Sequence, residues 1–262
     1  PTFNSESSID ECLSRINDPD IEIYVIDSHS TDKTESIAMS HNNVNFIKFK
    51  WNKSYPKKRN WTLMNIDLKH DWVLFLDSDE FINKNIIDEI KQKINHTKVK
   101  GFWIHYENYF NNKIIKYGIR QKKLALFHKK SGLYEKIDIN YNTNLDMEIH
   151  EHPVINGKVA ALDNTIRHQD IRPLENLFHK HIDYAVWEKF RSYTISNWTD
   201  LSLRQKIKYK LISSIFFPYI YFFANYFIYL GFLDGKNGLH HSLFKFNYFL
   251  TIYLLLSEDK QT

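Results

Sequence analysis

The stretch DWVLFLDSDEF, residues 71–81, decides the fold of this chain. Its four apolar residues at 73–76 run directly into a cluster of acids. A short apolar run that ends in acid is typical of a buried strand that delivers carboxylates to the rim of a sheet. The charges of Asp77, Asp79 and Glu80 repel one another, so we expect a positive partner among them. A divalent metal ion is the first candidate.

Helical and extended patterns alternate along the first hundred residues. Strand patterns cover residues 21–27, 43–49 and 71–77, and helical patterns cover residues 5–16, 28–42, 57–69 and 83–95. This alternation predicts an open α/β sheet in which most strands run parallel. Ligands bind at the carboxyl ends of strands in such sheets, and Asp27 and Asp77 both stand at such ends. We also expect Ser30 or Thr31 to cap the second helix.

The pattern changes after residue 100. Strand patterns without regular helices between them cover residues 101–110, 122–129 and 159–168, and a helical pattern resumes over residues 175–193. We therefore expect a mixed extension of the sheet that carries substrate loops. The predicted domains are a catalytic domain over residues 1–200 and a helical region over residues 201–262.

The carboxyl-terminal region is rich in apolar and aromatic residues. Residues 211–233 are long enough to span a bilayer, but Pro218, Asn225 and several tyrosines interrupt their apolar character. We expect helices that lie on a membrane surface, with the basic residues at 204–210 against anionic headgroups. The predicted location is cytoplasmic, peripherally at the inner face of the cytoplasmic membrane. Packing on the catalytic domain, a homo-oligomer contact and a true span are the alternatives.

Composition excludes several classes of function. The chain of 262 residues has 7 glycines and neither a G-x-G-x-x-G nor a G-x-x-x-x-G-K-[ST] motif, which argues against dinucleotide and P-loop sites. Its single cysteine, Cys12, excludes an internal disulfide and a cysteine-based zinc site, and it fits a reducing compartment. The opening PTFNSESS shows no secretory signal. Its start at Pro1 leads us to expect a missing preceding segment, up to a whole strand.

A basic group lies at residues 48–59. It is able to meet a phosphate, a nucleic acid or solvent. Because its residues are not interleaved with aromatic side chains in a nucleic-acid recognition pattern, we expect no nucleic-acid partner.

The motifs PTFNSE, VIDSHSTDKT, KKRNWTL and FLDSDE resemble, in order and spacing, those of the family 2 glycosyltransferases with the GT-A fold. The later IHEHPVINGKVAAL, HQDIRPLENLFHKHIDYA and GFLDGKNGLHHSL are similar to the bacterial branch that adds glucose or related sugars to lipopolysaccharide core, the WaaE/KdtX type. The resemblance implies an inverting transfer of a hexose from a UDP-sugar. The acceptor would be lipopolysaccharide core or another lipid-linked glycan of the cell envelope.

The resemblance assigns donor-nucleotide contacts to six residues: Thr2, Asn4, Glu6, Asp27, Arg59 and Asp77. It also implies a metal ion, Mg²⁺ or Mn²⁺, held by Asp79 and Asp77, with His168 as a weaker third ligand. Such a cation neutralises the charge that develops on a diphosphate leaving group. One or two carboxylates, together with phosphates and water, satisfy a hard cation of this kind.

Simpler explanations exist for three of the acidic and basic residues. Asp27 is also placed to cap the helix that follows it. Arg59 is also compatible with a solvated position on a basic helix. Asp32 is better explained as an acid at a helix start than as a ligand.

An inverting transfer needs a base that takes the proton of the acceptor hydroxyl. The resemblance implies a carboxylate after the metal motif, and DMEIHEHP offers Glu148 and Glu151. We favour Glu151 because its H-E-H-P-V context matches the branch pattern. A zinc site at His150 and His152 is disfavoured, since the sequence offers no third ligand nearby.

The chain departs from the branch pattern in one place. The branch carries an arginine before Leu-Phe in the 120–130 segment, where this chain reads Leu124-Ala125-Leu126-Phe127. The phosphate or acceptor contact of that arginine is therefore either absent or supplied by Arg120, Lys122 or Lys123. The departure bears on the acceptor more than on the reaction type.

Two other functions compete with the transferase. In a haloacid-dehalogenase-type phosphatase Asp77 would be the nucleophile, but that family expects Thr or Val where this chain has Phe81, and it places the D-x-D on its first strand. The other is a non-catalytic, membrane-bound sugar-binding or scaffold protein. The presence of every carboxylate that the reaction needs argues against it.

Overall fold

The computed structural model describes the chain except residues 17, 96–97, 137–145, 147–152, 171–172, 194–202 and 259–262. The chain forms two compact units. The first consists of Pro1–Glu107 and Gln121–Gln169, and the second of Asn108–Arg120 and Asp170–Thr262. By contacts, the helical unit therefore begins at Asp170 rather than at residue 201, and it includes a hairpin from the middle of the chain.

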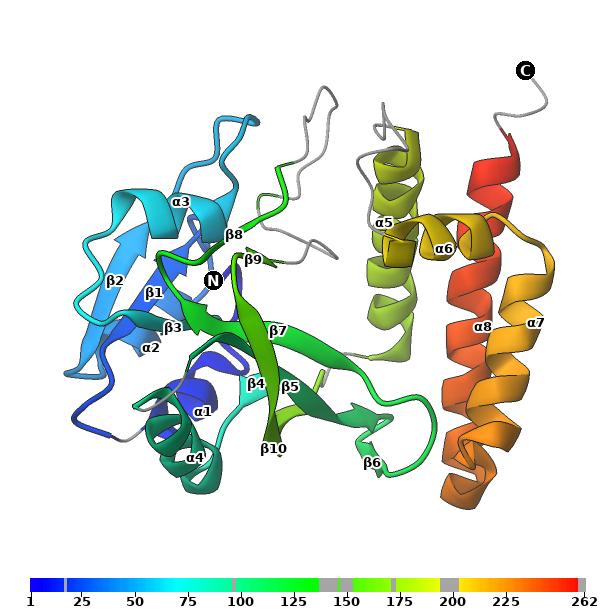
Figure 1. The fold of residues 1–262 in the computed structure, drawn as a ribbon, viewed down its shortest axis with the longest axis horizontal. Helices are drawn as coiled ribbons and strands as arrows, with labels where there is room; N and C mark the ends of the chain where they lie inside the picture. Colours follow the sequence, from blue (N-terminus) through cyan, green and yellow to red (C-terminus); the bar gives the residue numbers. More distant parts are fainter. Residues whose placement is uncertain are drawn as a thin grey trace. The chain divides into compact units, whose positions relative to one another are not determined.

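The first unit is an α/β structure (Figure 1). Its helices are α1 (Ile9–Ser14), α2 (Thr34–Met39), α3 (Lys58–Asn65) and α4 (Lys84–Ile94). Its strands are β1 (Ile23–Asp27), β2 (Val44–Lys48), β3 (Trp72–Leu74), β4 (Glu80–Phe81), β7 (Lys122–His128), β8 (Gly132–Tyr134), β9 (Pro153–Ile155), β10 (Lys158–His168) and most of β5 (Val99–Phe110). The predicted helices and strands occur in the predicted order, and β4, β8 and β9 are additional strands.

The strands form separate parallel and antiparallel groups. β1 and β2 pair in parallel from Ile23↔Val44 to Asp27↔Lys48. The larger sheet has the order β3-β7-β5-β10-β4, with β6 (Lys113–Ile115) beside β5, and β8 pairs with β9. β7 pairs antiparallel with both β3 and β5, and β10 pairs antiparallel with β4. β1 thus forms parallel pairs while β7 and β4 lie in antiparallel ones, and the sheet is more mixed than the alternating pattern predicts.

The core of this unit lies between the strands and the helices α1, α2 and α4. Ile86 of α4, Ile104 of β5 and Ile166 of β10 are fully buried in one cluster. The cap residue Asn83 starts α4, because its side chain accepts a hydrogen bond from the Ile86 amide at 3.1 Å. This packing holds β3 and β4 in place, on which the acids of the 71–81 stretch depend.

The predicted cap of the second helix is wrong. α2 begins at Thr34, and neither Ser30 nor Thr31 caps it. The N-cap position is Lys33, and the preceding Asp32 accepts from the Thr34 amide at 3.0 Å through its Oδ1. Hydrogen bonds from Thr34 and from the Glu6 amide outweigh the effect of burial and lower the pKa of Asp32. The alternative that Asp32 is an acid at a helix start therefore fits the structure.

Helix α3 buries a polar face. Lys58, Arg59 and Asn60 are 1%, 7% and 1% exposed. Asn60 forms two hydrogen bonds with the backbone of Tyr134: its Nδ2 donates to the carbonyl at 2.9 Å, and its Oδ1 accepts from the amide at 2.8 Å. The alternative that Arg59 is solvated is therefore wrong, and buried cations of this kind need anionic partners.

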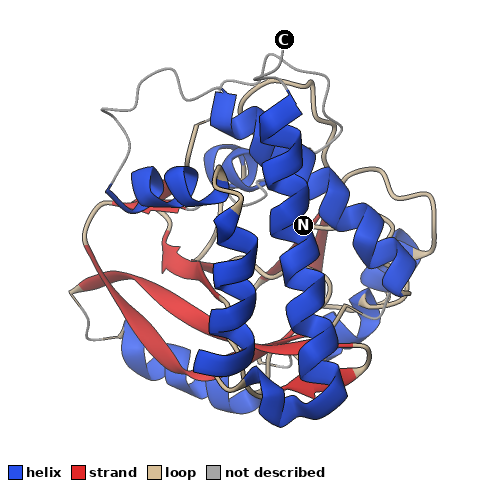
Figure 2. Ribbon diagram, turned by 90° about the vertical axis from the view of Figure 1, so that its right-hand side faces the viewer, coloured by secondary structure: helices blue, strands red, loops and turns tan. Residues whose placement is uncertain are grey.

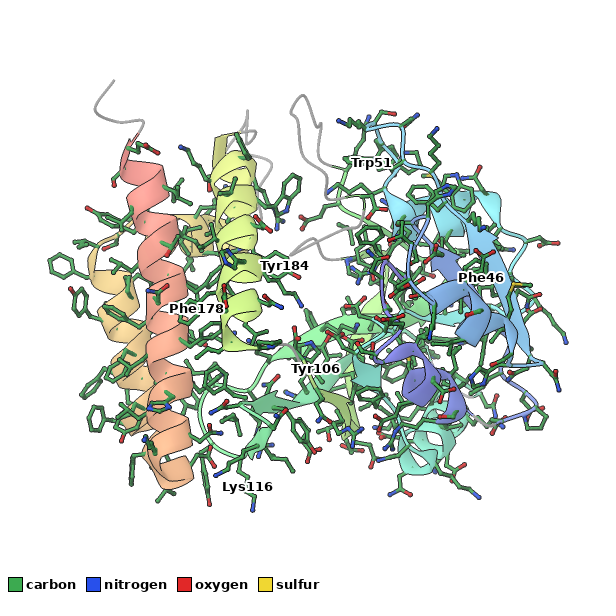
Figure 3. All side chains as sticks on the ribbon, turned by 180° about the vertical axis from the view of Figure 1, so that it is seen from behind. Phe46, Trp51, Tyr106, Lys116, Phe178 and Tyr184 are labelled. Atoms are coloured by element: carbon green, nitrogen blue, oxygen red, sulfur yellow. The ribbon has the colours of Figure 1, made fainter. Side chains whose placement is uncertain are left out.

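The second unit is mainly helical. It contains α5 (Leu174–Tyr193), α6 (Leu203–Ile212), α7 (Phe216–Phe223), the π-helix η2 (Ala224–Ile228), the 3-10 helix η3 (Gly231–Asp234) and α8 (Gly235–Glu258). α8 packs against both α5 and α7, and Figure 2 shows helices of this unit running alongside one another. Aromatic side chains fill the space between α5 and α8, where the rings of Phe178 and Phe244 are 5.0 Å apart (Figure 3).

Polar residues within the apolar region are part of this packing. Asn225 is 1% exposed; its Nδ2 donates to Ser242 Oγ at 2.8 Å and its Oδ1 accepts from the Ile119 amide at 2.7 Å. Asp234 accepts from the amide of Tyr117 at 2.9 Å. Gly238 lies so close to the Gly231 carbonyl that a Cβ there would be only 1.9 Å from its oxygen. The motif GFLDGKNG thus fixes the hairpin of β6 onto the helices.

An apolar face of this unit is exposed. Its residues lie on α7, η2 and the turn that follows: Phe216, Tyr219, Ile220, Phe223, Phe227, Ile228 and Tyr229. Among the described residues, no single helix has the length and apolar character of a membrane span. The bent pair Lys206–Ile212 and Phe216–Ile228, which turns by 104°, meets those criteria only when its two parts are taken together.

Candidate active site

The rim of the first unit collects charged residues where β3 ends. β3 pairs with β7 so that Leu74 faces Leu126, and continuing that antiparallel register puts Lys123 opposite Asp77. Lys123 Nζ lies 3.8 Å from Asp77 Oδ2. On the other side, Arg59 Nη2 donates to Asp77 Oδ1 at 2.6 Å. The Arg59 guanidinium also lies over the Tyr134 ring, 5.4 Å from its centroid.

These cations set the protonation of Asp77. Burial raises the pKa of this carboxyl, but the positive charges of Lys123 and Arg59 outweigh it and hold the pKa well below its usual range. Asp77 is therefore an anion at neutral pH and is already charge-paired.

Glu80 is directed into the sheet. It is 1% exposed, its Oε1 accepts from the Tyr106 hydroxyl, and its Oε2 accepts from Lys123 Nζ. The same Oε2 accepts from the Asp77 amide at 3.0 Å. Burial, Glu80 and Asp77 raise the pKa of Tyr106 well above its ordinary value, so its hydroxyl stays protonated as a donor. Figure 3 labels Tyr106 on β5.

Asp79 and His168 meet on the same rim. β10 pairs with β4 so that His168 faces Glu80, and the next amide, that of Gln169, donates to the Asp79 carbonyl at 3.1 Å. This register brings His168 Nε2 to 3.7 Å from Asp79 Oδ2. Both side chains are partly exposed, at 31% and 21%. The structure therefore brings together two of the three predicted metal ligands, and Asp77 lies two residues away with its own cationic partners.

Asp27 is buried at the end of β1. Its carboxylate accepts from Thr2 Oγ1 at 3.0 Å, from the Ser30 amide at 2.8 Å and from Ser30 Oγ at 2.5 Å. Asp27 and Thr2 are 1% and 5% exposed. Asp27 shapes the loop after β1 and does not cap α2, which begins later at Thr34.

Asn4 and Glu6 line the same loop. Asn4 Oδ1 accepts from the Thr31 amide at 2.9 Å, and Glu6 Oε2 accepts from the Lys33 amide at 3.0 Å. Asn4 holds a positive φ of 47°, which Asn tolerates better than most residues. The predicted nucleotide residues Thr2, Asn4 and Glu6 thus form a polar ledge beside Asp27.

Two residues that the sequence did not single out complete this ledge. Lys58 Nζ donates to the Thr2 carbonyl at 3.0 Å and lies 3.4 Å from Asp146 Oδ2. Burial lowers the pKa of Lys58, and the neighbouring Asp146 opposes that shift. Ser28 Oγ donates to the same carboxylate. Lys58 belongs to a basic run that gives no hint of which member is buried, and Asp146 is distant in sequence.

The candidate bases Glu148 and Glu151, with His150 and His152, lie outside the described residues. Asp146 and Pro153 are the described residues on either side of this segment, and the Asp146 carbonyl accepts from the Lys58 amide at 3.0 Å. The choice between the two glutamates stays a prediction.

The donor set suits a substrate-completed metal site. No group of three or more His, Cys, Asp or Glu side chains within the described ranges could hold an ion by itself. Mg²⁺ and Mn²⁺ need no such cage, because phosphate oxygens and water complete their shells. Asp79 and His168 offer a carboxylate and an imidazole at one point of the rim, which fits this type of site.

We predict that Arg59→Met costs about 2 kcal/mol of unfolding free energy at pH 7, because it leaves the partly buried Asp77 without its closest cation. The folded pKa of Asp77 is depressed, so the ion pair stabilises the fold above about pH 4, the unfolded value, and this contribution declines as the pH falls. The cost should therefore shrink between pH 7 and pH 3 in urea unfolding experiments.

The matched control is Arg15→Met, which removes an exposed ion pair between Arg15 Nη2 and Glu11 Oε1, 2.7 Å apart. This change should lower the free energy of unfolding by less than about 1 kcal/mol. A cost of Arg59→Met that stays constant from pH 7 to pH 3 would contradict the assigned ion pair.

Comparison with known proteins agrees with this geometry. Residues 1–152, more than half of the chain, match the model of the family described as Glycosyl transferase family 2. An uncharacterized glycosyltransferase from Rickettsia bellii is 25% identical over 193 residues, which are 70% of this chain and 63% of that protein. The poly(ribitol-phosphate) beta-N-acetylglucosaminyltransferase TarS of Staphylococcus aureus is 34% identical over 117 residues, 38% of this chain and 20% of TarS.

A crystal structure of S. aureus TarS 1–349 covers 100% of this chain and is itself covered to 90%, with 16% identity and a TM-score of 0.48. The chain spans less than two thirds of the length of the curated relatives it matches, at 63% and 20%. The predicted GT-A type of α/β fold, with a mixed sheet and an aromatic-rich helical region after it, agrees with the family match, and the phosphatase alternative does not. The chain belongs to glycosyl transferase family 2.

Proposed function

We propose that this chain carries the catalytic part of an inverting glycosyltransferase that moves a hexose from a UDP-sugar to a lipid-linked glycan of the cell envelope. The observation that carries the proposal is the joint rim of β1 and β3 in a family 2 chain. There, Asp77 pairs with Arg59 and Lys123, Asp79 lies beside His168, and Asp27 ends β1.

The ledge of Thr2, Asn4 and Glu6 is the proposed seat of the nucleotide base. The uridine would lie against Asp27, and the ribose against Asp77. Arg59 and Lys123 are the proposed hydrogen-bond donors to the diphosphate. Because both already pair with Asp77 and Glu80, the added charge of the diphosphate also calls for the proposed metal ion. Lys123 is thus the proposed substitute for the arginine that the branch carries in this segment.

Asp79 and His168 are the proposed ligands of Mg²⁺ or Mn²⁺, and Asp77 supports them from the ribose side. The ion would supply charge neutralisation for the departing diphosphate. His168 is oriented by the neighbouring Tyr106, whose ring centroid is 5.2 Å from its own. Glu151, or else Glu148, is the proposed base that takes the proton of the acceptor hydroxyl.

The exposed aromatic face of α7 and η2 motivates the class of acceptor. A contiguous exposed apolar face such as this one marks an interaction surface. An enzyme that modifies lipid-anchored glycans works faster when it is concentrated at the bilayer that holds its acceptor. Lys206 and Lys210 of α6 precede that face and suit anionic headgroups. Glucose as the sugar and lipopolysaccharide core as the acceptor rest on the motifs that resemble the WaaE/KdtX type.

The metal role predicts that Asp79→Asn lowers UDP release by about 100-fold or more. The measurement is UDP release from a panel of UDP-sugars, with and without Mn²⁺. Asp71→Asn, at the other end of the same strand, is the control and should stay near wild type. Turnover without metal, or an undiminished Asp79 variant, would remove the metal role. Phosphate release from an aryl phosphate would point to a phosphatase.

The base assignment predicts that Glu151→Gln abolishes transfer, with a loss of about 100-fold or more, and leaves UDP-sugar binding nearly intact. Glu148→Gln is the matched comparison and should retain most of the activity. Titration calorimetry with the donor separates binding from chemistry. The reverse result would assign the base to Glu148.

The membrane role predicts that the protein sediments with vesicles that contain anionic phospholipid. Phe216→Ser combined with Phe223→Ser should lower the bound fraction by about tenfold or more, because both rings would insert into the interface. Met39→Ser combined with Val154→Ser removes exposed apolar side chains from the first unit and serves as the control. Unchanged vesicle binding by the Phe variant, or its loss of self-association instead, would contradict this role.

A further inference from the structure

A lysine interrupts the aromatic-rich helix α8. Lys245 is the only Asp, Glu, Lys or Arg residue between Lys236 and Glu258, and a phenylalanine flanks it on each side. Its side chain is partly buried, and within the described part of the chain it has no hydrogen bond and no ion pair. Because the burial of an unpaired charge is costly, a lysine at this position favours an anionic ligand beside it.

Helices α5 and α8 pack against each other in the same direction. The rings of Phe178 and Phe244 are 5.0 Å apart, and Lys189 Nζ lies 3.5 Å from Glu258 Oε2 further along both helices. Figure 3 labels Phe178 and Tyr184 on α5. The two helices are therefore parallel, and a groove runs between them.

Two lysines lie on the same side of this groove. The His181 ring of α5 contacts the Phe244 ring of α8, with centroids 4.5 Å apart. Lys180 precedes this contact on α5, and Lys245 follows it on α8. In parallel right-handed helices, residues placed in this way project to the same side. Burial, together with the positive charge of Lys180, accordingly lowers the pKa of Lys245 to about 8.

His241 adds a buried imidazole to the same side. It lies one turn before Lys245 on α8 and therefore on the same face. It is 8% exposed, and its Nδ1 is buried without a hydrogen-bond partner among the described residues. Burial and the charges of Lys245 and His181 lower the pKa of His241 to about 3, so the ring is neutral at pH 7. A neutral imidazole that carries its proton on Nδ1 donates one hydrogen bond to an anion.

Two acids of this unit are already paired. Lys180 Nζ donates to Asp170 Oδ2 at 3.0 Å, and Lys208 Nζ donates to Glu188 Oε1 at 2.9 Å. Asp170 balances one of the two lysines of the groove, so the charge of Lys245 is left over. The donors of the groove come from two helices. A phosphate group, with several acceptor oxygens in a tetrahedral arrangement, meets such donors better than a planar carboxylate does.

We propose that Lys245, His241 and Lys180 bind a phosphate group in the groove between α5 and α8. Inorganic phosphate and phosphate esters share the chemistry that this site recognises. In the proposed glycosyltransferase the group would be a phosphate ester on the lipid-linked glycan acceptor, and this assignment rests on the proposed function. The phosphate site itself rests only on the helical unit, and its residues differ from those assigned to the donor.

Acetylation of Lys245 tests the site. The full chain is treated with acetic anhydride at pH 8, near the pKa of the Lys245 amine, and each lysine is quantified by mass spectrometry. A bound phosphate keeps this amine protonated and covers it. We expect inorganic phosphate, compared with chloride at equal ionic strength, to slow acetylation of Lys245 by about fivefold or more. The exposed Lys236 of the same helix is the internal control and should react at an unchanged rate.

Phosphate esters and matched variants extend the test. Glucose 1-phosphate should protect Lys245 as inorganic phosphate does, whereas glucose and acetate should not. His241→Phe keeps an aromatic ring beside Phe110 and removes the imidazole nitrogens, so it should weaken the protection by about threefold or more. His240→Phe, at the exposed neighbouring position, is the matched control and should retain full protection.

The absence of protection at Lys245, equal slowing at Lys236, or equal protection by acetate would overturn the phosphate site. Protection by vesicles of phosphatidylglycerol, but by neither phosphate nor glucose 1-phosphate, would assign the site to a lipid headgroup and overturn the acceptor assignment. The measurement does not depend on turnover of a UDP-sugar. Protection of Lys245 without any turnover would therefore support the site and contradict the proposed function, and turnover without protection would do the reverse.

Discussion

The pairing of buried cations with rim carboxylates is the constraint on which this structure depends. α3 places Lys58 and Arg59 in the interior, where neither is stable without an anion. Lys58 reaches Asp146 and the Thr2 carbonyl, while Arg59 reaches Asp77. One helix therefore ties the ledge after β1 to the acids after β3. The loops that carry the predicted nucleotide residues take their positions from these contacts.

The same ion pairs distinguish the acids of the 71–81 stretch, because two of them are paired with cations and the third is partly exposed. The buried Glu80 carboxylate accepts hydrogen bonds from Lys123 and Tyr106, and Arg59 donates to the Asp77 carboxylate and neutralises its charge. Asp79 instead stands at the partly exposed edge beside His168. The lysine and arginine of the protein itself largely relieve the charge repulsion among the three acids. The proposed cation is therefore needed only at Asp79, a narrower location than the acid-rich sequence suggests.

Sequence patterns predicted what depends on local order. The short apolar run before Asp27 became β1, while only the first part of the run before Asp77 became a strand, since β3 ends at Leu74; the resemblance to family 2 was confirmed. Contacts that depend on antiparallel register between distant strands, such as Lys123 beside Asp77, leave no local signal. The prediction that Ser30 caps α2 was wrong, because the amide and the hydroxyl of Ser30 both donate to the Asp27 carboxylate and the helix begins only at Thr34. The burial of Asn225 likewise follows from its bonds to Ser242 and Ile119, which hydropathy does not reveal.

The most direct measurement is an anomalous difference map from crystals of the protein soaked with UDP and Mn²⁺. A manganese peak in contact with Asp79 and His168, next to the diphosphate of a UDP whose phosphates meet Arg59, is the predicted result. Bound UDP with manganese elsewhere, or with Asp79 and His168 turned away from the phosphates, would contradict the account.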